Sequence, residues 1–90
     1  RGDFTDEHID ILFKLYREHC FGNNDMYIDN VLKGFPKDKK DIFREAVDDL
    51  VRRGYLGSKS KKHGMKVFIN PRFRREIFDA IADKNPFLRF

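Results

Sequence analysis

The chain has 90 residues, of which 40% are hydrophobic and 38% are charged, and its formal net charge at pH 7 is +4. This length fits one domain of modest size, over residues 1–90, with enough apolar mass for a single core. The composition excludes a two-domain enzyme and a disordered tail, and no apolar run approaches the roughly 20 residues that span a membrane. We therefore expect a soluble, cytoplasmic protein.

A first helix is predicted over about residues 5–21. Thr5 is a suitable N-cap, and Asp6 and Glu7 follow it in the first turn, where the helix dipole favours acidic side chains. Apolar residues then recur at the spacing of one helix face, at Ile9, Leu12, Phe13, Tyr16 and Cys20. Gly22, followed by two asparagines, predicts the end of this helix.

A second, shorter helix is predicted over about residues 28–33, with a tight turn at 34–36 after it. The residues before this helix leave two interpretations open, because Met26 and Ile28 fit either a short strand or the first helical turn.

A third helix is predicted over about residues 38–53, with Asp38 as N-cap and Asp41 in the capping-box position. At 100° per residue, one side of this helix is apolar and comprises Ile42, Phe43, Ala46, Val47, Leu50 and Val51. Gly54 predicts its end.

The second half of the chain predicts a β-hairpin over about residues 55–69 and a last helix over about residues 71–83. Met65, Val67 and Ile69 alternate with Lys66, Phe68 and Asn70, which is the period of a strand. Gly64 lies in a polar tip that suits a hairpin turn. Asn70 is a suitable N-cap for the last helix. An apolar tail, residues 86–90, follows.

Positive charge is concentrated around the hairpin. Residues 54–76 hold seven basic side chains and one acidic side chain, whereas residues 1–36 hold four basic and seven acidic ones. Such a local excess is typical of a surface that contacts a polyanion, although a solvated surface gives the same pattern.

The third helix ends in Leu50-Val51-Arg52-Arg53-Gly54-Tyr55-Leu56, and the basic hairpin follows at once. Over residues 9–81 this order of elements resembles a winged helix-turn-helix domain of the kind found in small archaeal and bacterial transcription regulators. The resemblance implies an α+β, mainly helical fold, with a three-helix bundle, a basic β-hairpin wing and a C-terminal helix.

The resemblance also implies binding of double-stranded DNA by a transcriptional regulator. The start of the third helix would enter the major groove, with Lys37, Lys39, Lys40 and Arg44 as candidate contacts. The wing would contact phosphates or the minor groove through Lys59, Lys61, Lys62, His63 and Lys66. Arg72, Arg74 and Arg75, at the start of the last helix, are expected to extend the same basic stripe.

Acidic residues on the third helix oppose part of this interpretation. Glu45, Asp48 and Asp49 lie on or beside its outward face and would repel a phosphate backbone, unless Arg44, Arg52 and Arg53 neutralise them through helix-spaced pairs. This shifts the expected binding toward the wing. A protein-interaction module and an RNA-binding module therefore stay open as alternatives.

No arrangement of residues predicts catalysis, a cofactor or a metal site. His8 and His19 lie about three turns apart on the first helix, which is too far for both to bind one metal ion. His63 has no neighbouring nucleophile or paired carboxylate in the sequence, and no glycine-rich phosphate loop is present. We expect a protein that is not an enzyme, and we expect Cys20 to be a small core residue.

The tail contains three large apolar side chains, Phe87, Leu88 and Phe90. Leaving such a side chain in water would forgo roughly 1.5–3 kcal/mol of the free energy that its burial supplies. Two interpretations stay open: the tail folds back over the first helix of the same subunit, or it contacts a second subunit in a homodimer.

Overall fold

The computed structural model describes residues 4–84. Over these residues the chain forms four α-helices and a three-stranded antiparallel sheet. The elements are α1 (Asp6–Arg17), β1 (Met26–Tyr27), α2 (Ile28–Lys33), the 3₁₀ turn η1 (Lys37–Lys39), α3 (Lys40–Arg52), β2 (Leu56–Lys61), β3 (Gly64–Ile69), the 3₁₀ turn η2 (Pro71–Phe73) and α4 (Arg74–Lys84). The sheet order is β1-β3-β2.

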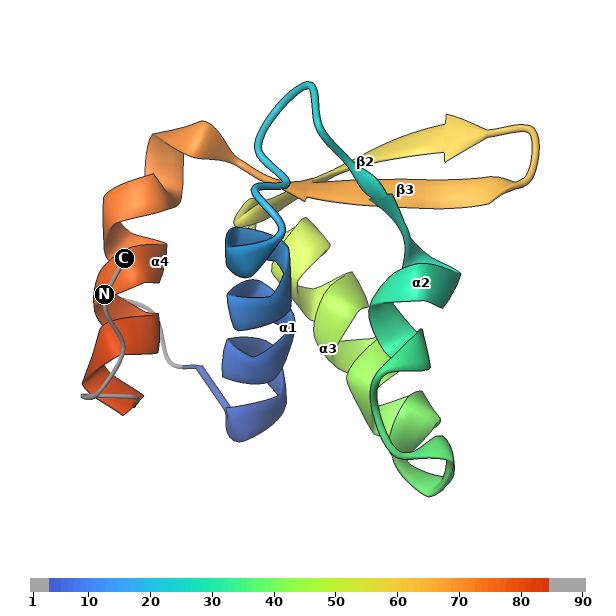
Figure 1. Cartoon of the computed structure of the whole chain (residues 1–90), viewed down its shortest axis with the longest axis horizontal. Coiled ribbons are helices and arrows are strands. Elements are labelled where there is room, and N and C mark those ends of the chain that lie inside the picture. The colour runs from blue at the N-terminus through green and yellow to red at the C-terminus, as the bar shows by residue number, and fades with distance from the viewer. Residues whose placement is uncertain (1–3, 85–90) are drawn as a thin grey trace.

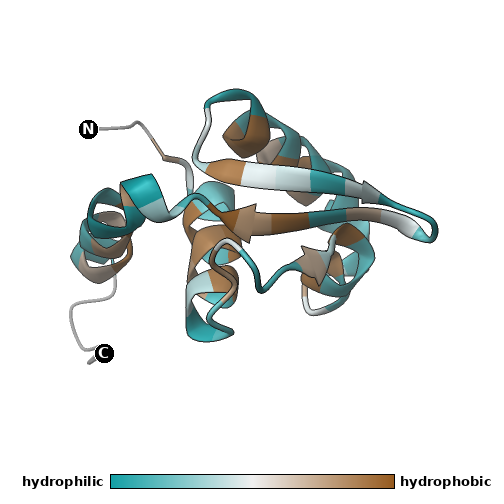
Figure 2. Ribbon diagram, turned by 90° about the horizontal axis from the view of Figure 1, so that it is seen from above, coloured by the Kyte–Doolittle hydropathy of each residue, from teal (hydrophilic) through white to brown (hydrophobic). Residues whose placement is uncertain are grey.

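The helices α1, α2 and α3 pack beneath one face of the sheet, and the β2–β3 hairpin projects beyond them (Figure 1). Apolar residues recur along the helices and along the strands (Figure 2), and the buried side chains of the core come from both layers. Ile11, Leu15, Leu50 and Ile69 are among the fully buried side chains of this core. The helix α4 lies at the end of the molecule opposite the hairpin tip (Figure 1). This arrangement confirms the α+β, mainly helical fold class and the expected order of elements.

The start of α1 is as predicted, but its end and its buried face differ from the prediction. Thr5 is the N-cap and accepts a hydrogen bond from the His8 N–H, while the His8 side chain accepts one from the Thr5 N–H. The helix ends at Arg17, and His19 takes a left-handed conformation with φ 58°. Ile11 and Leu15 are fully buried although the single-face pattern omitted them. The buried stripe is wider than one face because α1 packs against α3, α4 and β3.

The prediction for the start of α3 was wrong. Asp38 lies within η1, where the Lys40 N–H bonds to the Lys37 carbonyl, and the N-cap of α3 is Lys39, which makes no side-chain cap. Phe43, Ala46, Val47 and Leu50 are buried as predicted, but Ile42 is 50% exposed. Ile42 lies at the margin of the apolar face of α3, and no element within residues 4–84 covers its side chain fully.

The hairpin and the segments that flank it follow the sequence prediction. Lys62 and His63 form the turn between β2 and β3, and Gly64 has φ 130°. Met26 belongs to a strand, paired with Val67, while Ile28 begins α2, so each of the two open interpretations holds for one residue.

The predicted cap of the last helix is present, but it caps the 3₁₀ turn η2, and the α-helix α4 begins at Arg74, three residues later than predicted. The apolar side of α4 packs inward. The Asn70 side chain accepts a hydrogen bond from the Arg72 N–H, and Pro71 opens η2. Ile77 and Ile81 of α4 are buried. The proposed contact residues of the tail, Phe87, Leu88 and Phe90, lie outside the described residues. Between residues 4 and 84, no helix is long and apolar enough to cross a membrane.

Candidate nucleic-acid interface

Two groups of basic side chains lie at one end of the long axis of the molecule. The tip of the hairpin and the start of α3 are both at this end, with α2 between them (Figure 1). The tip group comprises Lys61, Lys62 and His63, and the helix group comprises Lys37, Lys39 and Lys40. All six side chains are exposed. We call these residues the basic end.

The hairpin tip carries cations that the protein itself does not neutralise. Within residues 4–84, neither Lys61 nor Lys62 pairs with a carboxylate, so both charges face solvent. Lys61 pairs in register with Gly64, the last pair before the turn. The tip projects beyond the helices (Figure 2), which leaves both lysines able to approach an extended polyanion.

At the base of the hairpin, unlike at the tip, the basic side chains are paired with a carboxylate. Lys59 and Lys66 are directly opposite each other on β2 and β3. The Nζ atom of Lys66 lies 3.0 Å from Oδ1 of Asp25, and that of Lys59 lies 3.4 Å from Oδ2. Only 10% of the Asp25 side chain is exposed. The hydrogen bond to Lys66 is the main cause that lowers the pKa of Asp25, and the same bond raises the pKa of Lys66.

Aromatic rings hold the same two lysines on the outer face of the sheet. The Lys66 ammonium lies 4.8 Å from the centre of the Tyr27 ring, and the Lys59 ammonium lies 5.2 Å from that of Phe68. Lys59 and Lys66 are therefore tied to the fold by their neighbours. The sequence analysis missed Asp25, because this residue lies outside the hairpin in sequence and only the pairing of β1 with β3 brings it near.

Along α3 the charge changes from basic to mixed. Lys37, Lys39 and Lys40 have no carboxylate partner within the described part of the chain. Arg44 lies 3.8 Å from Asp48, and both side chains are more than half exposed, so this pair is weak. The lysines outside these ion pairs therefore lie in η1 and at the first residue of α3, where Asp38 and Asp41 lie next to them in sequence.

The far end of α3 holds a network of ion pairs. Asp49 contacts Arg52 at 2.9 Å, Arg53 at 3.2 Å and Nε2 of His8 at 3.0 Å. Burial raises the pKa of Asp49, but the hydrogen bonds from Arg52 and Arg53 outweigh it and lower the pKa overall. Burial lowers the pKa of His8, whose Nδ1 accepts the Thr5 N–H. These groups join α1 to α3 and are not arranged to receive a phosphate.

The arginines at the start of α4 lie at the other end of the hairpin. Since β3 is six residues long, about 20 Å of strand separates them from the tip. Arg74 lies over the ring of Phe21, 4.7 Å from its centre, and Arg75 lies 3.5 Å from Asp79.

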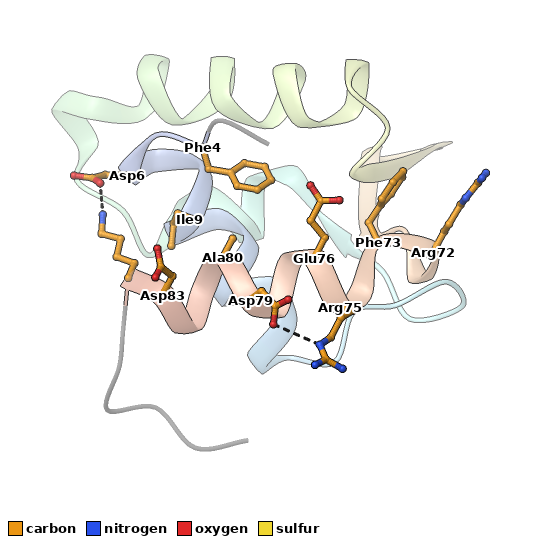
Figure 3. A pocket seen from close by; sticks show the side chains of 11 residues that line it. Phe4, Asp6, Ile9, Arg72, Phe73, Arg75, Glu76, Asp79, Ala80 and Asp83 are labelled. Atoms are coloured by element: carbon orange, nitrogen blue, oxygen red, sulfur yellow. Dashed lines mark ion pairs between the residues drawn. The ribbon is translucent and has the colours of Figure 1, made fainter. Parts of the chain in front are cut away.

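Arg72 and Arg75 border an open groove of about 740 Å³ between α1 and α4 (Figure 3). The carboxylates of Asp6, Glu76, Asp79 and Asp83 line the same groove. The structure therefore brings the hairpin tip and the start of α3 to one end, and it places Arg72, Arg74 and Arg75 on a surface of mixed charge at the other.

Other candidate chemistry is limited. Cys20 is 2% exposed, as predicted for a core residue, and burial raises the pKa of its thiol. Among residues 4–84, no three His, Cys, Asp or Glu side chains are placed to hold a metal ion.

The fold is that of a winged helix. Among solved structures, the chain is similar to TubR from Bacillus megaterium pBM400, with a TM-score of 0.77, 15% sequence identity and 88% of each chain covered. No protein-family model and no curated protein sequence matches the chain. At this identity the likeness shows the fold.

Proposed function

We propose that the protein binds double-stranded DNA through the basic end and acts as a transcriptional regulator. The start of α3 would read base edges in the major groove, and the hairpin tip would contact phosphates or the adjacent minor groove. The observation that carries the proposal is that five lysines without carboxylate partners in residues 4–84 lie at one end of a winged helix. They are Lys37, Lys39, Lys40, Lys61 and Lys62.

Several of the predicted binding residues already have a partner in the protein, and these should contribute less to DNA binding than the five lysines. Lys59 and Lys66 share Asp25, so they position the hairpin and add less to phosphate binding. Arg44, with Asp48 beside it, would contribute less than Lys40. The three arginines of η2 and α4 would contribute least, because DNA held at the basic end reaches them only if it bends around the hairpin.

Binding should depend strongly on salt. If each of the five lysines neutralises one phosphate, the slope of log affinity against log salt concentration is about −4 to −5. A slope near zero with any duplex would contradict the proposal.

Selection of bound duplexes from a random pool tests the proposal most directly. Enrichment of a short motif is expected from major-groove reading, and an inverted repeat of that motif would also identify a homodimer. Equal recovery of all sequences would contradict base reading by α3. Preference for structured RNA over duplex DNA of equal charge would favour the RNA-binding alternative.

A further inference from the structure

Two large apolar side chains stand out on the described surface, and they lie in surroundings of opposite charge. Ile42 of α3 is 50% exposed and Met65 of β3 is 42% exposed. Single exposed apolar residues are common on protein surfaces, so exposure alone implies nothing. Here Ile42 lies beside a groove lined by carboxylates, and Met65 lies on the hairpin whose tip carries Lys61 and Lys62.

Ile42 borders a groove of about 570 Å³ between the start of α1 and α3. Four carboxylates also line this groove, those of Glu7, Glu45, Asp48 and Asp49. Arg52 lines it as well. Two of the four carboxylates are already paired, Asp48 with Arg44, and Asp49 with Arg52 and Arg53. Glu7 and Glu45 have no basic partner within residues 4–84, so these two supply the unpaired negative charge of the groove beside an apolar side chain. We call it the acidic groove.

Met65 lies on β3 near the tip of the hairpin. It is on the same side of β3 as Val67 and Ile69, which are fully buried. Met65 itself is 42% exposed, so the buried part of this face ends between Met65 and Val67. Met65 pairs in register with Ser60, and Lys61 pairs with Gly64, so the Lys61 side chain lies on the opposite face of the hairpin from Met65. Lys62 lies in the turn, and neither lysine is paired with a carboxylate within the described residues.

We propose that the hairpin tip of one copy of the protein docks into the acidic groove of a second copy. Met65, on one face of the tip, would contact Ile42 and Ala46, while Lys61 on the opposite face and Lys62 in the turn would meet Glu45 and Glu7. The opposite charges of the hairpin tip and the groove, together with the two exposed apolar side chains, carry this inference.

The contact would be heterologous, because the tip and the groove are different surfaces. A hairpin tip in a groove of this size buries less than a standard interface of about 1,600 Å², so the association is weak and transient. It also uses Lys61 and Lys62, so one hairpin tip cannot hold a groove and a phosphate backbone at once.

A pair of charge-reversed variants tests the proposal without nucleic acid. The first variant, Glu45→Lys with Asp48→Lys, makes the groove basic, and the second, Lys61→Glu with Lys62→Glu, makes the tip acidic. Sedimentation velocity at about 20 mM salt, where attraction between charges is weakly screened, measures self-association of the wild type and of each variant. We expect the wild type to associate and each variant alone to lose about tenfold or more in association constant, because like charges then face each other.

An equimolar mixture of the two variants should restore association, since the basic tip of the first fits the acidic groove of the second and the reverse pairing is also complementary. Restoration would show as well that both variants are folded. Met65→Ser and Ile42→Ser should each weaken wild-type association about threefold to tenfold, since each removes one exposed apolar contact.

Three results would overturn the inference. They are a wild type that stays monomeric at low salt, association that both charge variants retain, and a mixture that does not associate. Because no nucleic acid is present, these results leave the proposed DNA binding untouched.

Discussion

The base and the tip of the hairpin carry the same kind of charge in different settings. At the base, Lys59 and Lys66 share the carboxylate of Asp25 and lie over aromatic rings. At the tip, Lys61 and Lys62 have neither kind of partner within the described residues. A count of basic residues treats the four as equal, but the contacts divide them into lysines that hold the hairpin and lysines that face outward.

The same division runs along α3. Its first turn follows exposed, unpaired lysines, whereas its last turn is occupied by the network of Asp49, Arg52 and Arg53 with His8. A cation that already has a partner must give it up before it can bind a phosphate, so the unpaired cations of the basic end should dominate binding.

The largest expected effect comes from reversing the charge of the tip. Lys61→Glu with Lys62→Glu should weaken binding to every duplex about 100-fold near 0.1 M salt and reduce the salt slope by about two, because two phosphate contacts are lost and replaced by repulsion. Fluorescence anisotropy with labelled duplexes measures both quantities.

The matched control makes the same charge change at the other end of the hairpin. Arg72→Glu with Arg75→Glu should cost about tenfold or less, since only long-range attraction is reduced. An equal loss in the two double variants would show that the arginines of α4 belong to the same interface.

A smaller effect is expected at the start of α3, on sequence preference. Lys40→Ala should reduce discrimination at one or two base pairs by about tenfold, within the usual range of about 1–3 kcal/mol for a base contact. Arg44→Ala should have a smaller effect, because Asp48 competes for its guanidinium group. Affinities for duplexes that differ by single base pairs measure the change, with Arg52→Ala as the control at the far end of the helix. If Arg44→Ala has the larger effect, the difference drawn between paired and unpaired cations does not hold on α3.

Removing the carboxylate at the hairpin base should change affinity in the opposite direction. Asp25→Asn frees Lys59 and Lys66 and removes a negative charge, so affinity for DNA should rise about threefold to tenfold. Asp79→Asn is the matched control, because it makes the same charge change beside Arg75 at the other end of the molecule. Unchanged affinity for the Asp25 variant would mean that the hairpin base lies outside the reach of the phosphates.

Local patterns in the sequence were sufficient to predict most of the fold. The Thr5 cap, the turn around Gly64 and the Asn70 cap depend on neighbouring residues, and the structure confirms them. The exposure of Ile42 could not be predicted in this way, because helical periodicity gives the direction of a side chain but not which element covers it.

For the candidate site, the sequence predicted where basic residues concentrate but not which of them have partners. Asp25 is 34 residues from Lys59 and 41 from Lys66, and the contact depends on β1 adding to the hairpin edge. The position of the arginines of α4 relative to the tip depends in the same way on the length and direction of β3. Non-local geometry therefore determines which of the predicted residues can act together.

The smallest expected effect concerns stability, and it tests whether the far end of α3 serves the fold. In the folded protein Nδ1 of His8 accepts the Thr5 N–H, so the imidazole is neutral there, and burial lowers its pKa from the ordinary value of 6.5. The unfolded chain then binds a proton more readily than the folded one, so this contribution to stability is fully present above about pH 6.5 and is lost as the pH falls below it.

Thermal unfolding between pH 8 and pH 5 measures this loss, and His8→Asn should make the profile flatter. A His8 variant whose profile stays as steep as that of the wild type would contradict this, because the group that costs stability at low pH would then lie outside the far end of α3.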